Sequence, residues 1–364
     1  MKQKKKTRMP GFSAGPVLFM GLAFQVILAG CPLSGGGRAE LTLLSWNVQN
    51  LFDDAVQGGE YGEFIPPQWT TANFNDKCAR LALVIQEAAP GGPDVVLLQE
   101  AENLAALEYL NRVYLKSCGY RYLALDKPPG QAAAVGILTR LPISQVIMHS
   151  YSTPDTGGDR YIAEYRLEVS GGVIIVFNNH WKSKLEGAAE TEPRRRMAAE
   201  ALTRRLESLR RGGEGHPVII AGDFNEDIEE YRLIDRAYPA ALIPLGEQSR
   251  LAEETGFLLY SFDSGDLRTP PASGGGTENR EVFFSPWGLT SGTGSYYYQG
   301  SWERIDQFFL SREFFDGQGW EFSAFSLNSG PEAADDQGRP RGFNKTTGKG
   351  ASDHFGLILR LRLL

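Results

Sequence analysis

The stretch Val218-Ile219-Ile220-Ala221-Gly222-Asp223-Phe224-Asn225 decides how we interpret the rest of the chain. Its run of apolar residues predicts a buried strand, and Gly222 lets the backbone turn sharply and release Asp223 and Asn225 at the strand end. A carboxylate there can take a proton from water, and an amide two residues later can hold that carboxylate or a substrate oxygen. The Gly-Asp-x-Asn pattern also forms ordinary Asx turns, so the choice depends on the other motifs.

Length and charge narrow the class of protein. The chain has 364 residues, which fits one large domain or two smaller ones. The candidate site residues run from Asn47 to His354, so we expect one catalytic domain over residues 40–364. The formal net charge is −7, although the first 30 residues hold five basic residues and no acid. The acidic body argues against a protein that coats nucleic acid non-specifically, but it permits an enzyme with a local basic cleft.

The N-terminal segment predicts export. A basic run over residues 2–8 precedes a short apolar stretch, which is typical of a signal peptide over residues 1–30. Leu28-Ala29-Gly30-Cys31 resembles the lipobox of bacterial lipoproteins, whose cysteine becomes the lipidated first residue; an ordinary secretory signal with an incidental cysteine is the alternative. Residues 31–39 predict a flexible tether. We expect a lipid anchor on Cys31 that holds the protein to a membrane of the cell envelope, with a secreted or periplasmic protein as the alternative.

Helical periodicity appears in four places. Apolar spacing predicts helices over Lys77–Ala89, Leu104–Lys116 with Asn103 as N-cap, Pro193–Arg211 with a starting proline, and Asp227–Arg236. We expect the arginines of the third helix on a solvated outer face; phosphate steering by residues 194–196 is the weaker alternative. Cys78 falls in the first of these helices and Cys118 lies two residues past the end of the second; the two could form a disulfide in an exported protein or be two buried thiols.

Strand patterns occupy much of the remaining chain. Residues 247–290 lack periodicity and predict surface loops. The predicted strands, besides Val218–Ala221, are Leu41–Ser45, Asp94–Glu100, Tyr120–Leu125, Val135–Thr139, Tyr161–Val169, Gly172–Phe177 and Phe355–Leu363.

Seven polar residues lie at the ends of predicted strands. Four of them follow an apolar run, and three precede or begin one. In sheets with antiparallel neighbours, the C-terminal end of one strand lies beside the N-terminal end of the next, so all of these groups can share one rim. The four that come after an apolar run are Asn47, Glu100, His180 and Asp223, and the three that precede or begin one are Asp306, Asp353 and His354.

The chemistry of this set is complementary. Asn47 and Glu100 offer hard oxygen ligands of the kind that Mg²⁺ accepts, with Mn²⁺ as an alternative. Four histidines without a thiolate cluster argue against zinc. A metal ion, a base for water and histidines for a developing oxyanion together describe phosphoester hydrolysis.

These motifs resemble those of the endonuclease/exonuclease/phosphatase superfamily, which includes deoxyribonuclease I, exonuclease III and bacterial sphingomyelinases. The resemblance covers nearly the whole chain after the tether, with each motif in family order. The matching stretches are Trp46-Asn47-Val48, Val96-Leu97-Leu98-Gln99-Glu100, Asn178-Asn179-His180, Gly222-Asp223-Phe224-Asn225, Arg304-Ile305-Asp306 and Ser352-Asp353-His354.

The resemblance implies a four-layer α/β/β/α sandwich with two packed mixed sheets. It also implies the role of each residue. Asn47 and Glu100 would hold Mg²⁺, with Asp353 as a further or alternative ligand. Asp223 would activate or orient the attacking water, supported by Asn225, and Asp306 would orient a transition-state-stabilising His354. His180 would bind the phosphate or assist the leaving group.

Several residues remain open to two interpretations. Trp181, Lys182 and Lys184 either line the phosphate site or pack along the sheet. The aromatic residues of Tyr296–Tyr298 and Trp302 either stack on bases or pack together. His149 and His216 match no motif, and we expect structural roles for both.

Three functions are compatible with these features. We expect an exported Mg²⁺-dependent phosphodiesterase whose substrate is DNA or RNA, because export suits the degradation of external nucleic acid. A sphingomyelinase-like or other small-molecule or lipid phosphoesterase is the alternative, although the only candidate for a membrane-dipping aromatic hairpin is Phe283-Phe284 with Trp287. A non-catalytic binding lipoprotein is the third. No protein partner is predicted.

Overall fold

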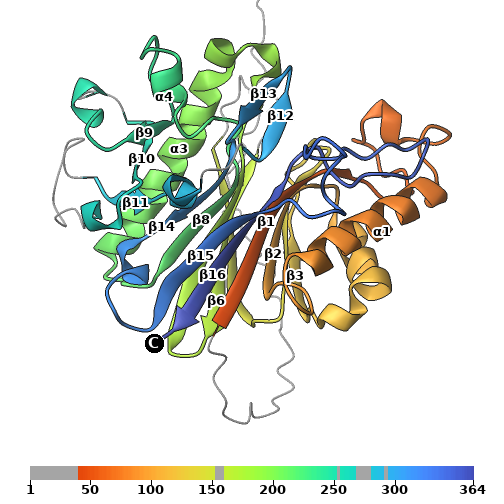
Figure 1. Ribbon diagram of the computed structural model, residues 1–364, viewed down its shortest axis with the longest axis horizontal. Helices are drawn as coiled ribbons and strands as arrows, with labels where there is room; N and C mark the ends of the chain where they lie inside the picture. The colour runs from red at the N-terminus through yellow and green to blue at the C-terminus, as the bar shows by residue number, and fades with distance from the viewer. Residues whose placement is uncertain (1–39, 152–159, 252–254, 268–279, 291–293) are drawn as a thin grey trace, which may run out of the picture. The chain divides into compact units, whose positions relative to one another are not determined.

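Two mixed β-sheets pack face to face within residues 38–364 (Figure 1). The computed structural model describes residues 40–151, 160–251, 255–267, 280–290 and 294–364. The predicted signal peptide, Cys31 and the tether lie outside the described residues. Among the helices that are described, none combines the length and apolar character needed to cross a membrane.

The first sheet has six strands and the second has eight. The first runs in the order β15 (Trp320–Asn328), β16 (Gly356–Leu363), β1 (Glu40–Leu51), β2 (Val95–Ala101), β4 (Ala134–Thr139) and β3 (Tyr122–Leu125). The second runs in the order β5 (Ile143–Ser150), β6 (Tyr161–Val169), β7 (Gly172–His180), β8 (Val218–Asp223), β14 (Asp306–Leu310), β11 (Val282–Phe284), β10 (Leu258–Ser261) and β9 (Leu242–Pro244). A separate hairpin pairs β12 (Tyr296–Tyr298) with β13 (Ser301–Glu303).

Helices cover the outer faces of both sheets. On the first sheet these are α1 (Thr71–Glu87) and α2 (Leu104–Tyr109), and on the second they are α3 (Ala188–Arg211) and α4 (Glu230–Leu233) (Figure 1). One apolar core fills the space between the sheets and under α3, and another lies between the first sheet and α1 and α2. The predicted four-layer α/β/β/α sandwich is therefore confirmed. Short 3₁₀ turns cover Gly62–Phe64, Lys116–Cys118, Lys184–Glu186, Gln248–Leu251, Ser264–Asp266, Pro286–Leu289 and Arg312–Phe314, and a π turn covers Leu110–Tyr114.

The helix boundaries differ from the predicted ones for local reasons. Helix α1 begins six residues earlier than predicted, because Thr70 and Asn73 form a reciprocal capping box. Asn103 caps α2 as predicted, but the α-helix ends at Tyr109 and continues as the π turn. Helix α3 begins at Ala188, so Pro193 lies inside it rather than at its start.

The predicted acidic helix over residues 227–236 is wrong except for one turn. The Asp227 carboxylate accepts hydrogen bonds from the backbone N–H groups of Glu229 and Arg304, at 2.9 and 2.8 Å. These bonds offer the backbone an alternative to the helical pattern. Only α4 is α-helical here.

The predicted loop over residues 247–290 is also partly wrong. Its described part contributes β10 and β11 to the second sheet, and both strands are buried. Phe283, Phe284 and Trp287 belong to the core, so they form no membrane-dipping hairpin. Strands of three or four residues are too short to show a period. The edge strand β5 was not predicted, and its side chains do not alternate between a buried and an exposed face.

Arg195 contradicts the predicted solvated face of α3. Its side chain is fully buried, and its guanidinium pairs with Glu192 at 2.6 Å and Glu226 at 3.3 Å. Charged residues are rarely buried unless they are paired, as here. Cys78 and Cys118 are both buried free thiols, which decides between the two predicted states.

Candidate active site

A cavity of about 870 Å³ opens at the rim where both sheets present polar residues. Seven of the eight predicted catalytic and metal-binding residues line it, and the eighth, Asp306, lies behind His354. The lining residues among them are Asn47, Glu100, His180, Asp223, Asn225, Asp353 and His354.

Strand register brings three of the polar residues into one row. His180 and Asp223 end the parallel neighbours β7 and β8, where they are directly paired. Asp306 begins the antiparallel strand β14 and pairs with Asp223 from the other side. Because β8 lies between β7 and β14, its pairing with both strands places the three residues side by side.

The stretch after β8 forms an Asx turn and also lines the cavity, so the two interpretations of this motif are compatible. The Asn225 backbone N–H donates to Asp223 Oδ1 at 2.8 Å, and Asn225 itself has a positive φ of 50°. Gly222 has φ 134°, and a Cβ there would overlap the backbone of Asn179 on β7. Only glycine permits this close approach of the two strands.

Asn47 and Glu100 lie at β-bulges inside strands β1 and β2, rather than after the strand ends as predicted. The pairing of β1 with β2 shifts register between Asn47 and Leu51, and Glu100 has φ 65°. Bulges commonly occur beside active sites, where they redirect a side chain. Left-handed backbone at a residue other than glycine is strained, and here it falls on a cavity-lining acid.

Hydrogen bonds through Asn47 link the acids of the two sheets. The Asn47 amide donates to Glu100 Oε1 at 3.0 Å and to Asp223 Oδ2 at 2.9 Å. His180 Nε2 lies 3.6 Å from Glu100 Oε1 and 3.8 Å from Asp223 Oδ2. The Asn50 backbone N–H donates to Glu100 Oε2 at 3.0 Å.

Burial shifts the pKa values of these groups. Desolvation, followed by the charge of Asp306, raises the pKa of Asp223 to about 7. Desolvation also raises the pKa of Glu100. It lowers the pKa of His180 well below its usual value, and the charge of Arg160 lowers it further. A carboxylate with a pKa near neutrality suits a general base.

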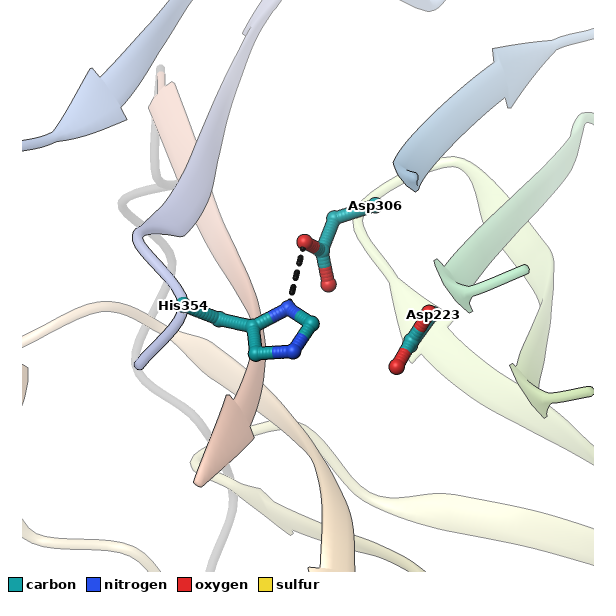
Figure 2. Close-up of side chains that lie close together, drawn as sticks. All are labelled: Asp223, Asp306 and His354. Atoms are coloured by element: carbon teal, nitrogen blue, oxygen red, sulfur yellow. Dashed lines mark hydrogen bonds and ion pairs between the residues drawn. The ribbon is translucent and has the colours of Figure 1, made fainter. Parts of the chain in front are cut away.

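His354 and Asp306 form a buried pair across the two sheets (Figure 2). His354 Nδ1 lies 2.8 Å from Asp306 Oδ2. Burial alone would lower the pKa of His354, but the charge and hydrogen bond of Asp306 outweigh it and hold the pKa well above its usual value. The histidine therefore carries a proton and a positive charge near Asp223.

The segment around His354 is fixed to the first predicted motif. The His354 backbone N–H donates to Ser352 Oγ at 3.1 Å, and Ser352 Oγ donates to the Asn47 carbonyl at 2.6 Å. The indole of Trp46 donates to the His354 carbonyl at 2.9 Å. Residues more than 300 positions apart in the sequence thus form one unit.

The donor set at the cavity fits a hard divalent cation. Asn47, Glu100 and Asp353 offer amide and carboxylate oxygens, which Mg²⁺ and Mn²⁺ accept. A second group, Asp223, Asp306 and His354, has potential ligand atoms within 4.8 Å of one another (Figure 2). There, however, His354 Nδ1 is hydrogen-bonded to Asp306, so this group acts as a charge pair. The all-oxygen set is the better fit.

Sequence reasoning missed Arg160 as a site residue. It lines the cavity, and its guanidinium donates to the carbonyls of Trp181 and, at 3.2 Å, of His180. Arg160 directly precedes the predicted strand Tyr161–Val169, so the rule that grouped the other residues by strand end also applies to it. A guanidinium at this position can contact a phosphate.

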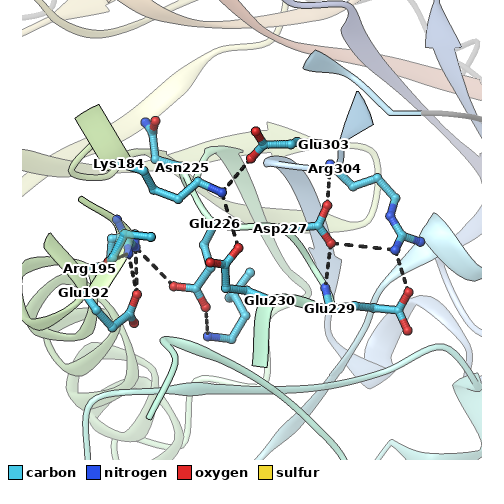
Figure 3. Close-up of polar contacts among 12 residues, drawn as sticks. Lys184, Glu192, Arg195, Asn225, Glu226, Asp227, Glu229, Glu230, Glu303 and Arg304 are labelled. Atoms are coloured by element: carbon cyan, nitrogen blue, oxygen red, sulfur yellow. Dashed lines mark hydrogen bonds and ion pairs between the residues drawn. The ribbon is translucent and has the colours of Figure 1, made fainter. Parts of the chain in front are cut away.

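The residues after His180 divide between the two interpretations. Trp181 is fully buried and packs on Phe224. Lys182 and Lys184 line the cavity. Lys184 Nζ lies 3.3 Å from Glu230 and 2.5 Å from Glu303, in a network of ion pairs beside Asn225 (Figure 3).

Neither histidine outside the motifs lines the cavity. His149 Nε2 lies 2.8 Å from Glu164 Oε2 in the second sheet, which fits a structural role.

The sequence matches the model of the endonuclease/exonuclease/phosphatase family over residues 42–237. No curated protein matches the chain with significance.

Solved structures share the fold at low sequence identity. TDP2 of D. rerio, humanized by 14 mutations, superposes with a TM-score of 0.51 at 17% identity, covering 89% of this chain and all of that one. TDP2 of Caenorhabditis elegans gives a TM-score of 0.53 at 13% identity, covering 89% and 74%. A family protein from Bacteroides vulgatus gives 0.51 at 12% identity, covering 90% and 100%.

Proposed function

Because the chain belongs to the endonuclease/exonuclease/phosphatase family, we propose that it is an exported, Mg²⁺-dependent phosphodiesterase that hydrolyses nucleic acid. The single observation that carries the proposal is the row of His180, Asp223 and Asp306, with His354 bonded to the last of these. A base near neutral pKa and a protonated histidine face one cavity. This is the pair of groups that water attack on a phosphoester requires.

Each residue has a role in the proposed reaction. Asn47, Glu100 and Asp353 would hold the metal ion, which neutralises phosphoryl charge when bound. Asp223 takes a proton from water or orients it, and Asn225 holds Asp223 through its backbone N–H. His354 stabilises the charge that develops on oxygen. His180 contacts the phosphate or assists the leaving group.

Two other functions are compared with this proposal. A lipid or small-molecule phosphoesterase would use the same site, but the only predicted membrane-dipping aromatic residues are buried in the core. A non-catalytic binding protein would not need its site residues, whereas here every expected residue is present and lines or supports one cavity.

Cleavage assays on several substrates test the proposal. The purified protein would be incubated with DNA and RNA oligonucleotides, plasmid and sphingomyelin vesicles, with Mg²⁺ or with chelator. We expect metal-dependent cleavage of nucleic acid that is lost in Asp223→Ala and kept in His149→Ala. Cleavage of sphingomyelin alone would support the lipid enzyme, and no cleavage of any substrate would support the binding protein.

We also propose that Cys31 carries the lipid anchor. The lipobox-like stretch before it supports this proposal. Wild-type protein should sediment with cell membranes, and Cys31→Ser should move to the soluble exported fraction. Equal membrane attachment of both proteins would contradict the anchor.

A further inference from the structure

We propose that the hairpin of β12 and β13 forms a ring-binding subsite, which holds the base of an unpaired nucleotide beside the scissile phosphate. This inference rests on the proposed function and specifies its substrate. It predicts a preference for single-stranded segments or free ends over intact duplex.

The hairpin is attached to the catalytic segment. Tyr296 forms an antiparallel backbone bridge with His354, and the Phe355 N–H donates to the Ser295 carbonyl at 2.7 Å. On the other strand, Glu303 pairs with Lys184 at 2.5 Å (Figure 3). The hairpin is therefore held at a fixed position beside His354.

Strand alternation divides the three tyrosines between two faces. Tyr296 and Tyr298 line the cavity, whereas Tyr297 does not. Tyr297 packs on the Trp302 ring at 5.1 Å between centroids and lies 5.1 Å from the Arg339 guanidinium. Successive side chains of a strand point to opposite faces, so packing and ligand binding are both served by this short hairpin.

The rings of the cavity face form a ladder that leads outward from His354. The Tyr296 ring lies 4.6 Å from the imidazole, tilted by 30°. The Tyr298 ring lies 6.0 Å from the Tyr296 ring and is nearly parallel to it, at 14°. Tyr298 is 44% exposed, and its hydroxyl accepts a hydrogen bond from the Gln299 amide at 3.0 Å. The outermost ring is therefore oriented and still accessible to a ligand.

Two further exposed side chains with apolar surface also line the cavity. Tyr61 is 47% exposed and Leu185 is 85% exposed, and both line the cavity. Tyr61, Leu185 and Tyr298 therefore offer exposed apolar surface to a ligand in this cavity. A planar ring that binds between these residues would bury their exposed apolar surface.

The charges of the cavity do not suit a long polyanion. Besides the protonated His354, its lining has three cationic residues, Arg160, Lys182 and Lys184, against five acids. Both lysines are already paired, Lys182 with Glu186 and Lys184 with Glu230 and Glu303. Duplex binding depends on many cation–phosphate contacts, which this lining does not supply.

Stacking compensates for that lack of charge. A base stacked on an aromatic side chain gains about 5- to 150-fold in affinity. Bases in a duplex are already stacked on one another and are not available to Tyr298. An unpaired nucleotide offers both a phosphate for the reactive centre and a ring for the hairpin.

Direct binding measurements test the subsite. Thymidine 5′-monophosphate and deoxyribose 5-phosphate differ only in the base, so calorimetric titration of each into the full protein isolates its contribution. We expect the nucleotide to bind at least about 10-fold more tightly. Tyr298→Ala should abolish the difference and Tyr298→Phe should keep it. Tyr297→Ala is the matched control from the other face, and it should also keep the difference.

Three outcomes would overturn the inference. These are equal binding of the two ligands to the wild type, an unchanged ratio in Tyr298→Ala, and an equal loss in Tyr297→Ala. Phenyl phosphate distinguishes the source of the ring, because affinity equal to that of the nucleotide would overturn the nucleobase as occupant. If the nucleotide binds preferentially but no phosphodiester is cleaved, the proposed function fails and the subsite stands. If phosphodiesters are cleaved but the nucleotide does not bind preferentially, the subsite fails and the proposed function stands.

Discussion

His354 and Asp306 approach within 2.8 Å although they belong to different sheets. Asp306 begins β14 of the second sheet, and His354 precedes β16 of the first. The pair therefore depends on the face-to-face packing of the two sheets. Asp306 is also in register with Asp223, so one contact between the sheets sets the position of the histidine relative to the base.

Substitutions of the two members of this pair should have different effects on hydrolysis. His354→Ala removes the charged group and should lower kcat by about 10²–10⁴, the usual contribution of a proton-transfer or charge-stabilising group. Asp306→Asn keeps the shape but removes the charge that keeps His354 protonated, so its pH–rate profile should shift to lower pH. Initial rates from pH 5 to 9 measure both effects. A wild-type profile in Asp306→Asn would contradict this coupling.

Gly222→Ala should destabilise the fold at the centre of the second sheet. The substitution adds a Cβ at φ 134° that would overlap the Asn179 backbone. Gly213 is the control, because it has φ 73° and open space around it. Left-handed strain costs about 1–2 kcal/mol, and a backbone clash adds to it. Thermal unfolding should show a larger loss for Gly222→Ala than for Gly213→Ala, and similar losses would refute the close-approach argument.

Lys77 should affect metal binding although it does not line the cavity. It is fully buried in α1, and desolvation lowers its pKa to about 7. Its ammonium donates to the carbonyls of Gln49 at 2.9 Å and Ala351 at 2.7 Å, each two residues from a proposed ligand. Second-layer contacts of this kind are worth about 10- to 100-fold in metal affinity.

The measurement for Lys77 is Mn²⁺ titration followed by electron paramagnetic resonance. Lys77→Met should weaken binding by about 10-fold or more. Arg80→Met is the matched control, since Arg80 is on the same helix and donates to the Gly348 carbonyl at 3.0 Å, farther along the chain from Asp353. Equal affinities in wild type and Lys77→Met would show that Lys77 does not position the ligands.

Glu164 should make stability depend on acid pH. Burial alone would raise its pKa, but hydrogen bonds from His149 and Arg205 outweigh it and lower the pKa to about 2. Because the folded pKa is below the unfolded value of 4.5, this contribution is complete above about pH 4.5 and disappears as pH falls toward 2. It amounts to roughly 3 kcal/mol.

Urea unfolding of wild type and Glu164→Gln tests this contribution. The difference in unfolding free energy between the two should be largest at pH 7 and should shrink at pH 3. A difference that does not change between these pH values would mean that the Glu164 carboxylate is not stabilised by its ion pairs.

The grouping of polar residues was predictable because it follows from a local rule, whereas the layers of the fold were predicted from the family resemblance of the motifs. The buried run before Asp223 is a strand, and polar residues at strand ends meet at one rim. The two bulges were not predictable, since the left-handed backbone of Glu100 depends on strand pairing rather than on its own preference.

Other differences arose from tertiary contacts. Arg195 is buried because Glu192 and Glu226 surround it, and residue 226 lies far along the chain. The short strands β9, β10 and β11 form by adding to a sheet edge, and the sequence of each is too short to carry a period. Tyr296 and Tyr298 line the cavity and Tyr297 does not, which could be known only once the structure showed which face of the hairpin meets the cavity.

Metal-dependent cleavage of bis(p-nitrophenyl) phosphate tests the central claim most directly, because this substrate needs neither a base nor a membrane. The purified wild type, Glu100→Gln and Asp223→Asn would be compared with Mg²⁺ and with chelator. We predict that the wild type releases p-nitrophenol with Mg²⁺ and not with chelator. In either variant the rate with Mg²⁺ should be at least about 100-fold lower. Equal rates with chelator, or wild-type rates in Asp223→Asn, would contradict a metal-dependent phosphodiesterase at this cavity.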